Sequence, residues 1–224
     1  MAAVSAELTI EPRGVRWTHL PLCVLDAVFS INARYSGVLR VCRAYADHDA
    51  LVDPMLPAAA ADTVLGTDRE HPVEALADLG RQLGAERVAG EVLRNRGRTS
   101  PRGGILKAAA AIRYSEVLTN AGVQRIGDVA ELLADPDRLA ETELQLAKVP
   151  GHGAGARLSY LWMLAGDDNH VKPDRMVLRW LQRHLDRPVT VPEARELLAA
   201  LADCLRRTAW EVDHAVWRRE SGRT

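Results

Sequence analysis

The sequence has few cysteines, and those it has are far apart. Cys23, Cys42 and Cys204 are odd in number and show no CxxC or Cys/His spacing, so neither a disulfide framework nor a metal site is predicted. Long apolar runs are missing, and so is a basic-then-apolar signal region at the N-terminus. These absences predict a chain that does not cross a membrane and that works in a reducing compartment, the cytoplasm.

An excess of charge of either sign is also absent. The 29 basic and 30 acidic residues nearly cancel, so the whole chain produces no field that attracts a polyanion. This balance argues mildly against tight nonspecific binding to nucleic acid. The local distribution of basic residues therefore matters more than the total.

Strand signals are weak throughout, whereas helical periodicity recurs, so the predicted fold class is all-α. Residues 1–16 are predicted to form a loose N-terminal arm, and the irregular residues 49–71 a flexible insertion. The expected helices cover residues 22–31, 34–46, 72–95 with an interruption at Gly84, 105–121, 126–134, 136–148, 191–207 and 208–219, with two more starting near Ala154 and at Pro173.

A tight turn, Val149-Pro150-Gly151-His152-Gly153, separates two of these helical patterns. Pro150 cannot continue a helix, and the glycines permit positive φ, so the backbone can reverse sharply. The first N–H groups of the next helix have no partners within the helix and can bind an anion such as a phosphate. The motif alone is equally compatible with a plain turn between antiparallel helices.

A second motif, Pro173-Asp174, follows a polar loop about twenty residues later. Proline is favoured at the first helical position, and Asp174 is then expected in the first turn, where the helix dipole stabilises a carboxylate. Taken alone, Asp174 is most simply a residue that starts a helix. The alternative is a carboxylate that faces a cationic transition state.

The two motifs together resemble the helix-hairpin-helix (HhH-GPD) superfamily of DNA glycosylases. The resemblance is strongest over residues 136–185. It implies a two-lobed all-α fold with the hairpin motif beside an inter-lobe cleft, and Asp174 as the catalytic carboxylate. The residues that it assigns to DNA contacts at the hairpin are Gly151, His152, Gly153, Ala154 and Gly155. No cofactor is implied, apart from a candidate site for a monovalent cation at Val149 to Gly153.

The resemblance also implies how the chain is divided. After the arm, residues 17–224 form the HhH-GPD-like domain. One lobe consists of residues 17–48 plus 173–224, and the other covers about 72–172. The implied partner is double-stranded DNA that carries a damaged or mismatched base, which a monomer extrudes and excises. Such a protein is nucleoid-associated if prokaryotic.

Several residues depart from the family pattern. Gly155 occupies the hairpin position where members that also cleave the backbone carry a lysine, so the resemblance implies a monofunctional enzyme. The four-cysteine iron–sulfur loop of some members is missing. Arg157 occupies a position where the family prefers a small residue, and His152 replaces an aliphatic one. His152 is either a phosphate contact or a packed turn residue.

Two further segments are candidate DNA contacts. In the family, the junction after the first helix supplies a wedge that fills the gap left by the extruded base, and Asn32 is the candidate here. The alternative is that Asn32 caps the next helix. A basic loop holds Arg96, Arg98 and Arg102, which either meet phosphates or form an ordinary solvated loop.

Two other functions remain open from the sequence. The chain is also compatible with a catalytically silent DNA-binding protein that keeps the fold, and with an enzyme that acts on a nucleobase-like substrate outside DNA. The identity of an excised base does not follow from the sequence, because it depends on side chains from several helices.

Overall fold

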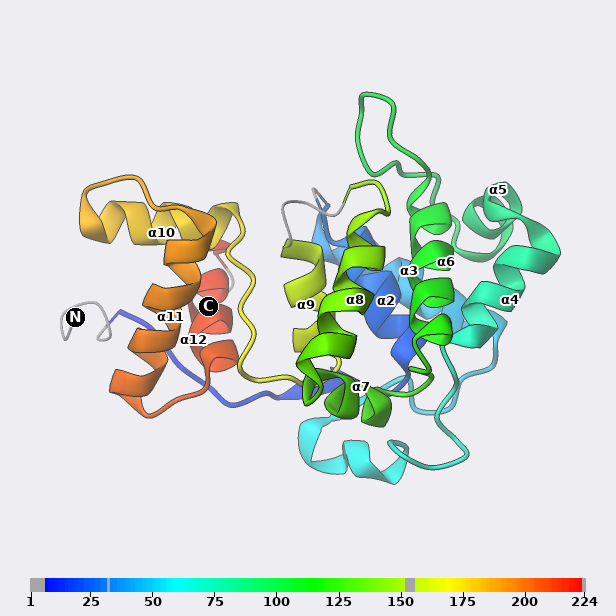
Figure 1. Ribbon diagram of the computed structural model, residues 1–224, viewed down its shortest axis with the longest axis horizontal. Coiled ribbons are helices and arrows are strands. Elements are labelled where there is room, and N and C mark those ends of the chain that lie inside the picture. Colours follow the sequence, from blue (N-terminus) through cyan, green and yellow to red (C-terminus); the bar gives the residue numbers. More distant parts are fainter. Residues whose placement is uncertain (1–6, 32, 152–155, 223–224) are drawn as a thin grey trace. The chain divides into compact units, whose positions relative to one another are not determined.

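The computed structural model describes residues 7–31, 33–151 and 156–222 (Figure 1). Helices dominate this part of the chain, together with one two-stranded antiparallel sheet, so the all-α prediction is confirmed. The chain divides into two compact units. The larger unit is Val15–Ala165, and in the smaller unit the segment that ends at Gly14 joins Gly166–Thr224.

The larger unit is built around one fully buried helix, α2 (Leu20–Phe29). Nine of its ten residues are apolar or proline, as expected for a helix surrounded by protein on every side. It packs against α3 (Tyr35–His48), α6 (Lys107–Asn120) and α9 (Ala156–Leu164). The one acidic residue of α2, Asp26, accepts a hydrogen bond from the indole Nε1 of Trp17 at 2.9 Å.

The other elements of the larger unit surround this core. They are β1 (Val15–Trp17), β2 (Met55–Pro57), the 3₁₀ helix η1 (Ala58–Thr63), α4 (Glu74–Leu83), α5 (Ala85–Arg87), the π-helical segment η2 (Val88–Val92), α7 (Ile126–Leu133) and α8 (Pro136–Ala147). The predicted interruption at Gly84 is confirmed, because its φ of +77° ends α4. Asp135 caps α8 by accepting from the Arg138 N–H, with Pro136 at the first helical position.

The segment 49–71, predicted as a flexible insertion, is held to the larger unit by specific contacts. Its strand β2 pairs with β1 in antiparallel register, with Arg16 opposite Leu56. The Glu70 side chain is 1% exposed and accepts a 2.6 Å hydrogen bond from the Ile126 N–H. Hydrogen bonds from His71 and His48 lower the pKa of Asp49 to about 2, although burial opposes this. The irregular sequence therefore forms an ordered connection.

The smaller unit consists of α10 (Arg175–Leu185), α11 (Val191–Leu205), α12 (Ala209–Glu220) and the N-terminal residues 7–14. Helices α10 and α11 both pack against α12 around a second apolar core. Thr190 and Thr208 cap α11 and α12 with their side-chain oxygens. Residues 7–14 are not a loose arm: Leu8 belongs to this core, and Arg13 pairs with Asp168 at 2.7 Å.

The predicted division into lobes is wrong for residues 17–48. These residues were expected to pack with 173–224, but α2 and α3 belong to the larger unit with α6 and α9. The physical reason is that α2 has no polar face: it needs neighbours on every side, and the helices of the larger unit supply them. The inter-lobe cleft implied by the resemblance stays a prediction.

Candidate functional site

The basic loop between η2 and α6 is ordered by its own backbone. The Thr99 N–H donates to the Ile105 carbonyl at 2.9 Å, and Arg98 forms an isolated β-bridge with Leu106. Two of the three candidate arginines bind other groups of the protein through their guanidinium groups. Arg98 donates from Nη1 to the Gly104 carbonyl at 2.7 Å, and Arg96 pairs with Glu86 at 3.0 Å.

Arg102 differs from the other two arginines of this loop. It is exposed, and its guanidinium has no hydrogen bond or ion pair with any residue that the structure describes. Its backbone N–H donates to Ser100 Oγ at 3.2 Å, which fixes the turn at the tip of the loop. Of the three candidates, Arg102 is therefore the one whose charge is available to a ligand.

The hairpin turn lies directly against this loop. Gly151 has φ +86°, a left-handed conformation that favours glycine, as the sequence predicted. A Cβ added at Gly151 would approach Thr99 Cβ to 2.5 Å and Arg157 Nη2 to 2.9 Å. The backbone at Gly151 can therefore pack this closely only because the side chain is absent.

Arg157, in the first turn of α9, is fully buried beneath the hairpin. Its Nη1 donates to the Pro150 carbonyl at 3.4 Å, and its guanidinium lies 5.3 Å from the centre of the Tyr114 ring. Its Nε and Nη2 have no hydrogen-bond acceptor among the described residues. Burial lowers the pKa of Arg157, and the nearby Tyr114 hydroxyl partly offsets this.

Lys107, the first residue of α6, connects the same region to the end of α2. Its Nζ donates to the Phe29 carbonyl at 3.0 Å and to the Ile31 carbonyl at 2.7 Å. Burial lowers the pKa of Lys107 to about 8, and the positive charge of Arg157 contributes. Ile31 directly precedes the wedge candidate Asn32 in the chain.

Three segments that are distant in sequence thus converge in the larger unit. The end of α2, the basic loop and the hairpin turn meet around Lys107, Thr99 and Arg157. No carboxylate among the described residues contributes to the pKa shifts of Lys107 or Arg157. Burying two cations is unfavourable, and for Lys107 the two carbonyl acceptors partly offset this cost.

Some predicted site residues lie outside the residues that the structure describes. These are Asn32, His152, Gly153, Ala154 and Gly155, so two of the five residues of the candidate cation site, Val149 to Gly153, are among them. Their assignments as wedge, phosphate contacts and cation ligands stay predictions.

Asp174, the predicted catalytic residue, lies in the smaller unit as the N-cap of α10. Its Oδ1 accepts hydrogen bonds from the N–H groups of Met176, at 2.8 Å, and Val177, at 3.3 Å. The expected register is therefore wrong by two residues: the helix begins at Arg175, and Pro173 precedes the cap. The reason is that the first N–H groups of a helix have no backbone acceptor within it, and the Asp174 side chain accepts from them in its place as the N-cap. Asp174 is half-buried.

A second carboxyl group close to Asp174 was missed in the sequence. Asp213, on α12, is 5% exposed, and its Oδ1 accepts a 3.3 Å hydrogen bond from the Lys172 N–H. Burial raises the pKa of Asp213 to about 8, and the negative charge of Asp174 contributes. A signal was present: Asp213 lies four residues after Ala209 and three before Val216, on the apolar face of its helix.

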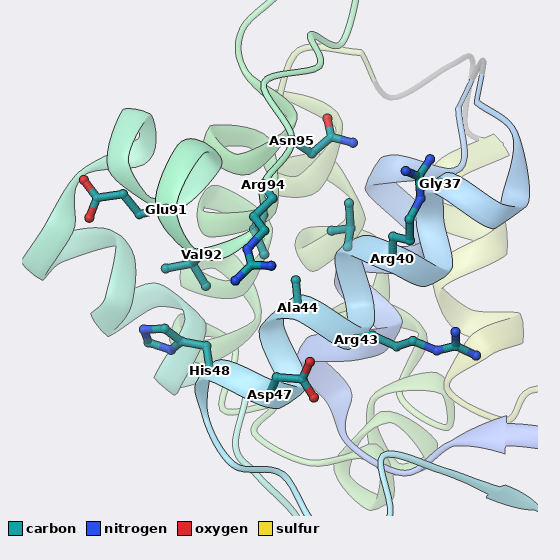
Figure 2. A pocket seen from close by; sticks show the side chains of 12 residues that line it. Gly37, Arg40, Arg43, Ala44, Asp47, His48, Glu91, Val92, Arg94 and Asn95 are labelled. Atoms are coloured by element: carbon teal, nitrogen blue, oxygen red, sulfur yellow. The ribbon is translucent and has the colours of Figure 1, made fainter.

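A surface groove of about 670 Å³ opens elsewhere in the larger unit, between α3 and a segment that includes the end of η2 and the three residues after it (Figure 2). Arginines from both sides line it, and Figure 2 shows the Arg94 side chain extending between η2 and α3. Arg40 and Arg43 lie opposite, but Asp47 and Glu91 line the same groove. The mixed charge gives no clear preference for an anion, and none of the predicted site residues lines it.

Two specialised features are absent from the described residues. None of their helices is both long enough and apolar enough to cross a membrane. No group of three or more His, Cys, Asp or Glu side chains among them is arranged to hold a metal ion.

Comparison with known proteins identifies a family for this chain. No curated protein and no solved structure matches the chain. A family model described as "Domain of unknown function (DUF8548)" matches residues 2–221. Because the match covers nearly the whole chain, the protein belongs to this family of domains of unknown function.

Proposed function

We propose that this protein is a monofunctional DNA glycosylase, which hydrolyses the N-glycosidic bond of an extruded damaged or mismatched base with the help of Asp174. The observation that carries the proposal is the convergence of the end of α2, the basic loop and the hairpin turn around Lys107, Thr99 and Arg157. The resemblance assigns the hairpin and the junction after α2 to DNA contacts, the basic loop is a candidate contact because of its arginines, and the three segments are far apart in the chain.

The electrostatics of this region support a phosphate ligand. Lys107 and Arg157 are buried without a nearby carboxylate among the described residues, and Arg102 carries an available charge on the adjoining loop. Neutralising phosphates releases counterions, which makes binding favourable at low salt and sensitive to added salt. A local cluster of this kind permits DNA binding despite a net charge of −1.

The surroundings of Asp174 support chemistry rather than binding alone. A base within a duplex must be extruded before its sugar bond can be reached. A carboxylate can then stabilise the positive charge that develops on the sugar, or orient the attacking water. The two carboxyl groups near the start of α10, Asp174 and Asp213, differ in environment, as is common where carboxyl groups take different roles.

The remaining parts of the proposal follow from the sequence. Gly155 provides no amine for a Schiff base, so the enzyme is expected to leave the DNA backbone intact. One monomer is expected to act on one duplex. The expected compartment is the cytoplasm, with nucleoid association in a prokaryote.

The test is a panel of duplexes that carry uracil, a thymine mismatch, alkylated purines or oxidised bases. We expect the purified protein to generate alkali-labile sites in at least one duplex, with strands that stay intact until alkali is added. Borohydride should trap no covalent adduct, because Gly155 offers no amine at the position where the bifunctional members of the family carry a lysine.

Two outcomes would change the assignment. A trapped adduct that disappears in Lys172→Ala would make the enzyme bifunctional. Binding to every duplex without alkali-labile sites in any of them would favour the catalytically silent DNA-binding protein, which needs the larger unit's cations but not Asp174.

Arg102 provides a separate prediction about binding. If its free guanidinium neutralises one phosphate, Arg102→Ala should reduce the slope of log affinity against log salt by about 0.9. Affinity should fall to a similar extent for all DNA sequences, as measured by fluorescence anisotropy at several salt concentrations. Arg113→Ala, which removes an exposed arginine from the middle of α6, is the matched control and should leave the slope unchanged. Equal slopes for both variants would remove the basic loop from the DNA-binding surface.

A further inference from the structure

The interior of the smaller unit contains a carboxyl group that its fold alone does not explain. Asp213 lies on the buried face of α12, beside Val212 and Val216, in a position where an apolar side chain would ordinarily pack. Its surroundings include no arginine or histidine partner that forms an ion pair with it among the described residues. Burying a carboxyl group in this way is costly unless the group stays neutral.

The contacts of Asp213 lead directly to Asp174. Its Oδ1 accepts from the Lys172 N–H at 3.3 Å, and the Lys172 carbonyl accepts from the Asp174 N–H at 2.6 Å. The backbone of Lys172 therefore connects Asp213 to the residue that caps α10. Asp174 in turn is fixed by the N–H groups of Met176 and Val177.

We propose that Asp213 is a positioning residue for Asp174: its uncharged carboxyl group holds the turn from Lys172 to Asp174 and so directs the Asp174 carboxylate. This inference rests on the proposed function for its catalytic consequence, but the positioning itself does not depend on a substrate. Ionisation of Asp213 would place a second negative charge beside Asp174, and the two carboxylates would repel each other.

The charges that act on Asp213 are consistent with a neutral group at neutral pH. Burial and the charge of Asp174 raise its pKa to about 8, while the Lys172 charge and the Lys172 N–H oppose this. His214, the next residue on α12, responds to other groups. Burial and the charges of Arg218 and Arg13 lower its pKa, and Glu11 opposes this.

The raised pKa also means that Asp213 lowers stability as pH rises. Between its ordinary pKa of 3.8 and its folded value of about 8, the folded protein holds a proton that the unfolded chain releases. Unfolding therefore becomes easier with rising pH over this interval. A group that costs stability at neutral pH is more often kept for function than for the fold.

The experiment compares wild type with Asp213→Asn and Asp213→Val. Asparagine keeps an uncharged oxygen that can accept from the Lys172 N–H, whereas valine removes it and matches the apolar neighbours. Single-turnover base release by the wild type should decline above about pH 8, and Asp213→Asn should lose this decline while keeping near wild-type rates at neutral pH. Asp213→Val should be at least tenfold slower at every pH, with little change in DNA affinity.

A second readout needs no substrate. The amide chemical shifts of Met176 and Val177, which report the Asp174 cap, should titrate with an apparent pKa of about 8 in the wild type and not in Asp213→Asn. As pH rises from 3.8 to about 8, the Tm of Asp213→Asn should increase relative to the Tm of the wild type. The Asp213→Val result counts only if the helical circular dichroism of this variant matches that of the wild type. If Asp213→Val does not fold, Asp213→Asn alone provides the test.

The outcomes separate this inference from the proposed function. If no base is released but the amides of Met176 and Val177 titrate, the glycosylase proposal is overturned and the coupling of Asp213 to Asp174 stands. Base release with amides that do not titrate, or with identical pH profiles for wild type and Asp213→Asn, would overturn the positioning role alone.

Discussion

Asp174→Asn should release base roughly 10² to 10⁴-fold more slowly than the wild type, the range typical of removing one positioned catalytic group. Asparagine keeps the side-chain oxygen that accepts from Met176 and Val177, so α10 should still begin at Arg175. The lost charge is expected to change the free energy of unfolding by only about 1 kcal/mol or less. DNA affinity should persist or increase, because a carboxylate no longer repels the phosphates.

The measurement is single-turnover base release beside a gel-shift titration on the same duplex. The chain supplies a matched control in Asp135, which caps α8 in the larger unit through the same type of side-chain hydrogen bond. Asp135→Asn should change stability by a similar amount and leave the rate of base release unchanged. If Asp174→Asn is as fast as the wild type, Asp174 is only a helix cap.

Gly151→Ala should weaken DNA binding by roughly 10- to 100-fold, the range expected when hydrogen bonds to a charged phosphate are lost. The added Cβ would lie 2.5 Å from Thr99 Cβ and 2.9 Å from Arg157 Nη2, and φ is +86°. Neither neighbour can move freely, because Thr99 is held in the loop ladder and Arg157 is fully buried. The hairpin turn should therefore shift away from the basic loop.

Gly122→Ala separates this clash from the general cost of a left-handed alanine. Gly122 has φ +75°, but a Cβ there would meet nothing within 4 Å. Backbone strain should cost each variant about 1–2 kcal/mol of stability. Gly151→Ala should lose further stability because of the clash, and it alone should lose DNA affinity. Fluorescence anisotropy and thermal unfolding measure the two effects. Equal DNA affinity for both variants would exclude the Gly151 turn from the binding surface.

Local features of the sequence were sufficient to predict most helices. Pro136 and Pro192 near helix starts, the break at Gly84 and the apolar periodicity are signals within a few residues, and the observed boundaries follow them closely. Gly151 and Gly153 were predicted to permit positive φ for the same local reason, and the φ of Gly151 confirms this at the described glycine of the pair. The exception is α10, where Asp174 rather than Pro173 determines the start.

Features that depend on contacts between distant residues were not predictable in the same way. The division into units depends on the partners of α2, which a fully apolar helix does not specify. Tertiary packing also determines three other features. They are the hydrogen bond of Arg98 within its own loop, the contact of Glu70 that holds residues 49–71, and the closeness of the charges of Lys107 and Arg157. Asp213 is different, because its place on an apolar helix face was visible in the sequence.

The measurement that tests the central claim most directly is the amount of free base and of abasic sites formed in one reaction. Free base is quantified by mass spectrometry and abasic sites by strand cleavage with alkali, using the best duplex of the panel. A monofunctional glycosylase predicts equal amounts of both in the wild type, intact strands before alkali, and a large parallel decrease in Asp174→Asn. Bound duplex without free base, or release that is unaffected in Asp174→Asn, would contradict the account.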